Sequence, residues 1–155
     1  MFEKILVPLD GSEHSQRALE CAIQISKRFS AKVTLLHVYS VAVPSVVMPE
    51  PATLTPAGVP IPVSTEVSKM VEGLRDAGRK ILSDAEQSAK SAEVETETLL
   101  KEGNAAQEIV RTAREGEYNL IVIGARGISR IKELFMGNVS EGVIKNAPCP
   151  VLVVK

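Results

Sequence analysis

Residues 121–146 read IVIGARGISRIKELFMGNVSEGVIKN, and the rest of the chain is organised around this stretch. It begins with an apolar run typical of a buried strand, breaks at Gly124, continues as a loop bracketed by glycines and re-enters a helix after Gly137. Backbone N–H groups in the first turn of a helix lack partners and carry the positive end of the helix dipole. A strand that leads through such a loop into a helix can therefore wrap these donors around an anion. We interpret the stretch as a phosphate-binding cradle.

The composition is that of an ordinary globular domain. With 155 residues the chain has the length of one domain, which we place at residues 1–155. Its 18 basic and 19 acidic side chains leave a formal charge of −1, and aromatic residues make up only 3%, so we expect no nucleic-acid partner. Cys21 and Cys149 form no C-x-x-C or zinc-type spacing, which fits a reduced setting. Neither a signal-peptide pattern nor a run of about 18 apolar residues occurs, so we expect a cytoplasmic protein without a membrane partner.

Apolar strand patterns alternate with amphipathic helix patterns along the chain. This alternation predicts a parallel, doubly wound sheet with right-handed crossovers. The predicted fold is therefore α/β, with a five-stranded, Rossmann-like sheet and helices on both faces. Strands are expected at residues 4–9, 32–39, 94–101, 119–123 and 150–154, and helices at residues 12–29, 66–92, 104–116 and after Gly137.

The two outermost strand patterns differ in polarity. Residues 94–101 alternate between polar and apolar side chains, which is typical of an edge strand. Residues 150–154, PVLVV, are apolar at every position, and an uncovered edge of this kind would be an aggregation hazard. We therefore expect a homodimer that covers the strand at residues 150–154.

Residues 41–64 interrupt the alternation. They hold six of the nine prolines of the chain, a density at which regular structure does not persist. Loops of this length are uncommon in compact domains and are either functional or mobile. A lid, a partner-binding arm and a disordered insertion all fit the stretch. Because it contains no clustered polar side chains, we favour a mobile insertion without chemistry.

The first strand and the glycine loop are expected to meet at one edge of the sheet. In open α/β sheets, ligands bind outside the carboxyl ends of the strands, where the winding direction reverses. If the strands at residues 4–9 and 119–123 are neighbours there, Asp10 faces Gly124. Gly124 and Gly127 would let the backbone approach phosphate oxygens and adopt positive φ.

The start of the last helix adds further donors to this loop. Asn138 and Glu141 form a capping-box pattern, so residues 137–140 would offer backbone N–H groups at a helix start. Short glycine motifs also match by chance, so two ordinary loop glycines and a capped helix remain the other interpretation. Among nearby cations, Arg126, Arg130 and Lys132 could meet phosphate charge or form a solvated basic face.

The glycine spacing resembles the signature of the universal stress proteins in their ATP-binding branch. That signature is G-x-x-G, nine residues, then G and Ser or Thr, and this chain has Gly124, Gly127 and Gly137 with Asn138 in the last place. The opening ILVPLDGSEHSQRAL and the ending NVSEGVIKNAPCPVLVVK are also similar to the family. The resemblance covers nearly everything except the proline-rich stretch, and it implies a sheet of the adenine nucleotide alpha hydrolase type.

The resemblance also implies a ligand, which is ATP or another adenine nucleotide, with or without Mg²⁺. The nucleotide would lie across the carboxyl ends of the first, second and fourth strands. Asn138 departs from the family, because ATP-binding members usually have a hydroxyl there and an amide is bulkier, although it still donates hydrogen bonds. The residues implied for the ribose and adenine are Pro8, Leu9, Asp10 and Val38, and those implied for the phosphates are Gly124, Gly127, Gly137, Asn138, Val139 and Ser140.

No motif for catalysis accompanies this site. The chain has no G-x-x-x-x-G-K-[ST], no G-x-G-x-x-G and no nucleophile elbow, and beyond Asp10 no metal site can be assembled. His37 is expected as a satisfied core histidine and His14 as a surface one. We therefore expect a non-catalytic regulatory or signalling module of the stress response that binds an adenine nucleotide and acts as a homodimer. A slow ATPase or adenylyl-transfer enzyme and a nucleotide-free dimeric interaction module remain as alternatives.

Overall fold

The computed structural model describes residues 2–41, 65–127 and 136–155. Apart from Val41, the predicted insertion at residues 41–64 lies outside these ranges, as do Arg130 and Lys132. None of the helices in the described ranges combines the length and the apolar character that a membrane span requires.

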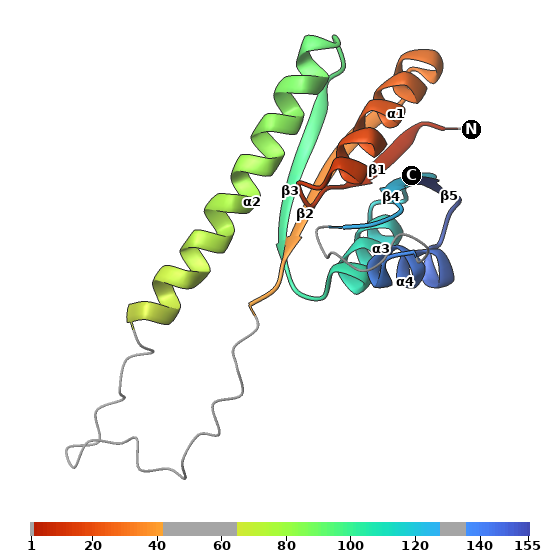
Figure 1. The fold of residues 1–155 in the computed structure, drawn as a ribbon. Coiled ribbons are helices and arrows are strands. Elements are labelled where there is room, and N and C mark those ends of the chain that lie inside the picture. The colour runs from red at the N-terminus through yellow and green to blue at the C-terminus, as the bar shows by residue number, and fades with distance from the viewer. Residues whose placement is uncertain (1, 42–64, 128–135) are drawn as a thin grey trace, which may run out of the picture.

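Five parallel strands form a single sheet, which confirms the predicted fold class (Figure 1). The sheet has the order β3-β2-β1-β4-β5, so β3 and β5 are its edges. The winding direction reverses between β1 and β4, where Ile5 pairs with Leu120. The strands are β1 (Lys4–Pro8), β2 (Lys32–Tyr39), β3 (Thr96–Glu102), β4 (Leu120–Gly124) and β5 (Val151–Val154).

Helices cover both faces of the sheet. The side chains of α1 (Glu13–Phe29) and α2 (Thr65–Ser91) pack on one face, and those of α3 (Ala105–Glu115) and α4 (Asn138–Asn146) pack on the other. Alternate residues of each central strand point to opposite faces, as the two-residue period of a strand requires. In β1, Ile5 and Val7 therefore join the core under α1 and α2, whereas Leu6 joins the core under α3 and α4.

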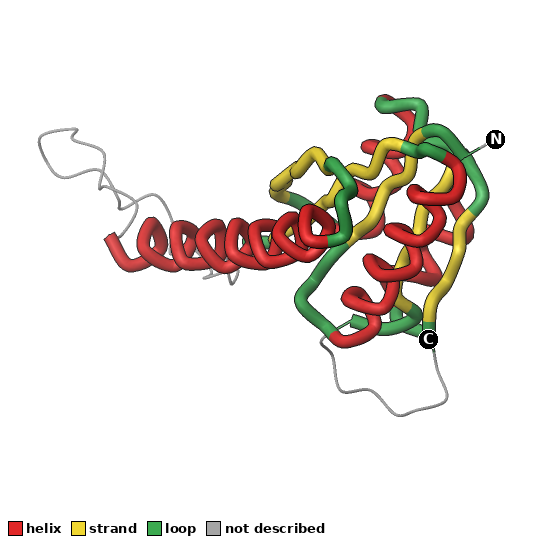
Figure 2. Tube along the Cα trace, turned by 90° about the horizontal axis from the view of Figure 1, so that it is seen from above, coloured by secondary structure: helices red, strands yellow, loops and turns green. Residues whose placement is uncertain are grey.

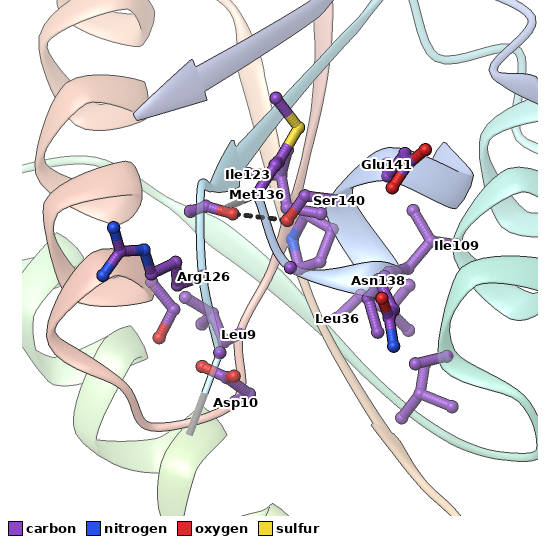
Figure 3. A pocket seen from close by; sticks show the side chains of 18 residues that line it. Leu9, Asp10, Leu36, Ile109, Ile123, Arg126, Met136, Asn138, Ser140 and Glu141 are labelled. Carbon is purple, nitrogen blue, oxygen red and sulfur yellow. Dashed lines mark hydrogen bonds between the residues drawn. The ribbon is translucent and has the colours of Figure 1, made fainter. Parts of the chain in front are cut away.

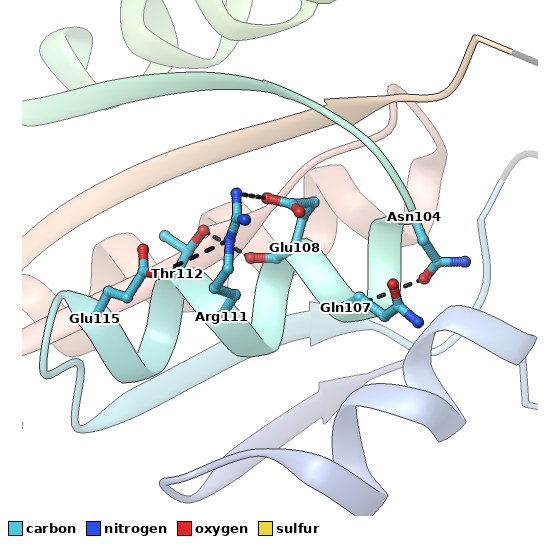
Figure 4. A network of polar contacts seen from close by, with 6 residues as sticks. All are labelled: Asn104, Gln107, Glu108, Arg111, Thr112 and Glu115. Carbon is cyan, nitrogen blue, oxygen red and sulfur yellow. Dashed lines mark hydrogen bonds and ion pairs between the residues drawn. The ribbon is translucent and has the colours of Figure 1, made fainter.

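Side-chain caps explain where two of the helices begin. The Ser12 hydroxyl accepts a hydrogen bond from the Ser15 backbone N–H (3.2 Å), and the Asn104 amide oxygen accepts one from the Gln107 N–H (3.1 Å). Both caps confirm the predicted starts of α1 and α3. Figure 4 shows the Asn104 cap together with the ion pairs that Arg111 makes along the exposed side of α3.

The first residue of the predicted edge strand belongs to the preceding helix end. The Val94 N–H donates to the Ala89 carbonyl (3.0 Å), and Val94 is buried in the core under α1 and α2. The strand ladder with β2 therefore begins at Thr96, which pairs with Val33. In the sequence alone, an apolar residue that packs just after the end of a helix cannot be distinguished from the first apolar residue of a strand.

Helix α2 is buried only in part. Figures 1 and 2 show that its N-terminal half projects beyond the sheet. Within the predicted apolar stripe, Leu82, Ala85 and Ala89 are buried, but Met70 in the projecting half is 52% exposed. The apolar stripe of α2 therefore extends further than the sheet that it covers.

The two glycines of α2 have different surroundings. A Cβ added at Gly78 would lie 2.6 Å from Cδ2 of His37 and 2.7 Å from Cδ1 of Leu100, whereas a Cβ at Gly73 would meet no atom within 4 Å. The His37 ring is held in place, because its Nδ1 is 2.7 Å from the Leu9 carbonyl oxygen. Gly78 therefore lets α2 approach β2 and β3 closely.

Alanine substitution of these two glycines should change stability in opposite directions. Gly73→Ala should raise the free energy of unfolding by up to about 1 kcal/mol, since glycine is a poor helix former. Gly78→Ala should lower it by about 1–3 kcal/mol, because the added methyl overpacks the contact with His37. Urea unfolding followed by circular dichroism measures both changes, and equal effects of the two substitutions would contradict the packing seen at Gly78.

Candidate functional site

A pocket of about 580 Å³ opens at the carboxyl edge of the sheet (Figure 3). Its volume lies in the range of small-molecule sites, roughly 300–1,000 Å³. Helices α1, α3 and α4 directly follow parallel strands, so their N-termini meet at this edge. The ten residues that the resemblance implied for the nucleotide all line this pocket: Pro8, Leu9, Asp10, Val38, Gly124, Gly127, Gly137, Asn138, Val139 and Ser140.

Further residues line the pocket that sequence reasoning did not assign to it. Ala105 and Ile109 come from the first turns of α3, and the Asn104 cap signal combined with the strand order would have brought them to this edge. The others carry no motif, since a buried Leu36 or Ile123 has the same pattern as any core residue. The additional lining residues are Ser15, Leu36, Ala105, Ile109, Ile123, Met136 and Glu141, and Arg126, which the sequence offered as a cation for phosphate, lines the pocket as well.

The pocket has an apolar side and a polar side. Leu36 and Val38 of β2 and Ala105 and Ile109 of α3 form the apolar side. Figure 3 shows Asp10 and Arg126 on the opposite side from Leu36 and Ile109. A molecule that fills the pocket would therefore need an apolar part and a polar part.

The start of α1 is attached to the glycine loop on the polar side. The Asp10 carboxylate accepts a hydrogen bond from the Ser12 N–H (3.0 Å), and the Ser12 hydroxyl donates to the Arg126 carbonyl (3.4 Å). A side chain at Gly127 would clash with the other oxygen of the Asp10 carboxylate. Asp10 is thus positioned by the backbone of α1 and lies directly against Gly127.

Gly124 is needed for a different reason from the predicted one. A Cβ at Gly124 would lie 2.7 Å from the carbonyl carbon of His14, so the absence of a side chain lets α1 pack against the end of β4. The expected positive φ at Gly124 and Gly127 is wrong, because among the described glycines positive φ occurs only at Gly11 and Gly103. Close packing between elements, rather than backbone conformation, requires glycine at Gly124.

The expected surface position of His14 is also wrong, because α1 packs closely against the end of β4 at Gly124. The residue is half-buried against Gly124, and its Nδ1 is buried without a hydrogen-bond partner among the described residues. Across the described ranges, no three His, Cys, Asp or Glu side chains gather as a metal site would require.

The predicted capping box at the start of α4 is also wrong. Gly137 is the N-cap, and no side chain among the described residues caps the helix. The Gly137 N–H donates to the Ala125 carbonyl (2.9 Å), which makes Gly137 the last residue before the helix and Asn138 the first residue within it. Instead of reaching back to the cap, Glu141 pairs with Lys145 (2.6 Å), and this ammonium holds the pKa of Glu141 below its ordinary value.

The first turn of α4 presents backbone donors to the pocket. The Glu141 N–H donates to the Gly137 carbonyl (3.0 Å), so the N–H groups of Asn138, Val139 and Ser140 have no partner within the helix. The Ser140 side chain is 3% exposed and its hydroxyl donates to the Gly124 carbonyl (2.7 Å; Figure 3). Ser140 therefore offers its backbone to a ligand, while its hydroxyl joins α4 to β4.

The model of the universal stress protein family matches residues 1–155. The chain belongs to this family. The universal stress protein YxiE of Bacillus subtilis strain 168 is 38% identical over 155 residues, which is 100% of both chains.

Solved universal stress proteins share the fold over nearly their whole length. UspA from Lactobacillus plantarum is 25% identical with a TM-score of 0.79, and the match covers 99% of this chain and 98% of that one. A universal stress protein crystallised in complex with cAMP is 26% identical with a TM-score of 0.68, and the match covers 99% of this chain and 97% of that one.

Two of the motif glycines should respond differently to substitution in the absence of ligand. Gly124→Ala should lower the free energy of unfolding by about 1–3 kcal/mol, because the methyl would overlap the His14 backbone and α1 would have to move. Gly137→Ala should cost less than about 1 kcal/mol, because alanine is only a poorer N-cap than glycine. At Gly137 the added Cβ would be 3.5 Å from its nearest neighbours, which is ordinary contact.

Urea unfolding of the ligand-free protein compares the two variants. Equal stability of Gly124→Ala and the unsubstituted protein would contradict a packing role for Gly124, and would leave ligand approach as the reason for the glycine.

Proposed function

We propose that this universal stress protein binds an adenine nucleotide in the pocket at the carboxyl edge of the sheet and acts as a nucleotide-dependent regulatory module. One observation carries the proposal: a single pocket combines an apolar side, a carboxylate and a helix start with unpaired N–H groups. A nucleotide has matching parts, namely a base, a ribose and phosphates.

The base and ribose fit the side of the pocket that β1 and β2 form. Leu36, Val38 and Ile109 offer an apolar surface for a planar base. The Asp10 carboxylate lies across the pocket from this surface, against Gly127 of the glycine loop, and can accept hydrogen bonds from ribose hydroxyls. The Ser12 N–H already holds one of its oxygens, so the carboxylate is oriented before a ligand arrives.

The phosphates fit the start of α4. The N–H groups of Asn138, Val139 and Ser140 lack partners within the helix, and the helix dipole adds a positive potential there. Arg126 also lines the pocket, on the Asp10 side, and adds a positive charge there. Mg²⁺ bound with the phosphates would take carboxylate ligands, and Asp10 and Glu141 are the carboxylates in the described lining.

The choice of adenine rests on similarity. A relative that is 26% identical over 99% of this chain was crystallised with cAMP, which carries adenine. ATP, AMP and cAMP all share the adenine base and the ribose and differ in their phosphates. The proposal therefore names the class of adenine nucleotides, with ATP as its first member to test.

Nucleotide binding should depend on Asp10. Titration of the purified protein with ATP, AMP and cAMP in a calorimeter should give saturable binding, and Asp10→Ala should weaken it by about 10- to 100-fold because a charged hydrogen-bond acceptor is lost. Asp76→Ala is the matched control, since Asp76 is an exposed α2 residue paired with Arg79 (2.9 Å). Unchanged circular dichroism of both variants shows that the fold is retained.

Two outcomes would contradict the proposal. The first is the absence of adenine nucleotide from the heat-denatured protein together with no heat of binding for any of the three ligands. The second is turnover of ATP that Asp10→Ala abolishes at unchanged fold, which would make the protein a slow enzyme rather than a binding module.

We further propose that the module is a homodimer joined through β5. This strand is an edge of the sheet, and Leu152 on it is 37% exposed. An apolar edge strand with unpaired backbone groups is stabilised when a second copy pairs with it. Pairing of two β5 strands would continue the sheet from one protomer into the other.

Sedimentation at micromolar concentration should therefore give the mass of a dimer. Leu152→Lys should shift the protein toward monomer, because a charged side chain on the edge opposes strand pairing. Met70→Lys is the control, since Met70 is also apolar and exposed but lies on the projecting half of α2. Loss of the dimer in the Met70 variant alone would locate the interface on α2 and contradict the role of β5.

A further inference from the structure

The direction of the Asn138 side chain follows from the way in which α4 packs on α3. A Cβ at Gly142 would lie 3.0 Å from the Cβ of Ala106, so Gly142 is on the face of α4 that contacts α3. Residues four positions apart lie on the same face of a helix. Asn138 is four residues before Gly142 and therefore lies on the α3-facing side of α4, one turn nearer the pocket.

The positions of the side chains around the pocket agree with this direction. In Figure 3 the Asn138 amide lies on the side of Leu36 and Ile109, and Asp10 and Arg126 lie across the pocket from it. Ala105, the first residue of α3, lines the same side. Asn138 is exposed and makes no cap hydrogen bond at the start of α4, and Figure 3 shows its amide on the apolar side of the pocket, away from Asp10 and Arg126.

A carboxamide beside an apolar surface can form hydrogen bonds with the edge of a base that lies on that surface. Adenine presents its 6-amino donor next to a ring-nitrogen acceptor on either of its two edges at that position. The Asn side chain offers an acceptor and a donor side by side, and this pairing is a recurrent mode of adenine recognition. The phosphates, in contrast, are bound by backbone N–H groups at the start of α4, which do not depend on the identity of this side chain.

We propose that Asn138 is a specificity-determining residue that hydrogen-bonds the adenine base, and that it is not a phosphate ligand. The inference rests on the proposed function, because it assumes that a nucleotide occupies the pocket. It assigns a role to the residue at which this chain departs from the hydroxyl usual in its family. It also predicts that substitution of Asn138 will weaken the contact with the base and not the contact with the phosphates.

The test compares ligands that differ in one part at a time. Binding of adenosine, AMP and ATP is measured by calorimetry for the unsubstituted protein and for Asn138→Leu, which keeps the approximate shape and removes both hydrogen-bonding groups. All three ligands should lose affinity by the same factor, about 5- to 100-fold for a two-hydrogen-bond contact with a base. Purine riboside 5′-monophosphate lacks the 6-amino group, so the preference for AMP over it should fall toward one in the variant.

The matched control is Asn146→Leu at the other end of α4. Asn146 is exposed and its amide donates to the Gly142 carbonyl (2.8 Å), so the same substitution is made on the same helix away from the pocket. Its affinities for adenosine, AMP and ATP should equal those of the unsubstituted protein. Thermal unfolding without ligand shows whether either variant has lost stability.

The remaining outcomes overturn the inference. If Asn138→Leu leaves the affinity for adenosine unchanged and lowers the affinity for ATP more than that for AMP, Asn138 is a phosphate ligand. If the affinities for all three ligands are unchanged, its side chain does not contact the ligand. In both cases the unsubstituted protein still binds adenine nucleotides, so the proposed function stands. Absence of binding of every ligand to the unsubstituted protein would instead overturn the proposed function and this inference together.

Discussion

The contact between the start of α1 and Gly124 determines the shape of the carboxyl edge of the sheet. The missing side chain at Gly124 lets the His14 backbone pack against the end of β4, and on the other face the Gly124 carbonyl accepts the Ser140 hydroxyl (2.7 Å). The same residue pairs with Val154 of β5. One glycine therefore joins two helices and an edge strand, and the pocket lies between the elements that it joins.

The convergence of helix starts at this edge is a consequence of the parallel sheet. Each helix that directly follows a strand must begin at the carboxyl edge in order to return to the opposite edge. The polar backbone groups at the starts of α1, α3 and α4 are thus gathered at the carboxyl edge. Apolar side chains from the ends of the strands line the pocket at the same edge. This topology alone is sufficient to produce a pocket that has one polar and one apolar side.

Much of the fold could be predicted from the sequence because periodicity is a local property. The apolar runs at β1, β2 and β4 and the caps at Ser12 and Asn104 depend on neighbours in the sequence, and the structure confirms them. The errors arose where a residue is defined by a distant contact. The role of Gly124 depends on His14, and the start of α4 depends on the hydrogen bond from Gly137 to Ala125.

The position of Asn138 illustrates why a motif alone does not define the chemistry of a site. The phosphate-binding part of such a motif is made of backbone N–H groups, whose positions are set by the helix and not by the side chain. At the first position of α4, the side chain follows the face that packs on α3, because Gly142 one turn later contacts Ala106. A short hydroxyl there stays near the backbone donors, whereas a longer amide extends along that face toward Ile109. On the proposed assignment, the exchange of a hydroxyl for an amide would move the contact from the phosphates to the base of a nucleotide and would leave the backbone donors at the helix start unchanged.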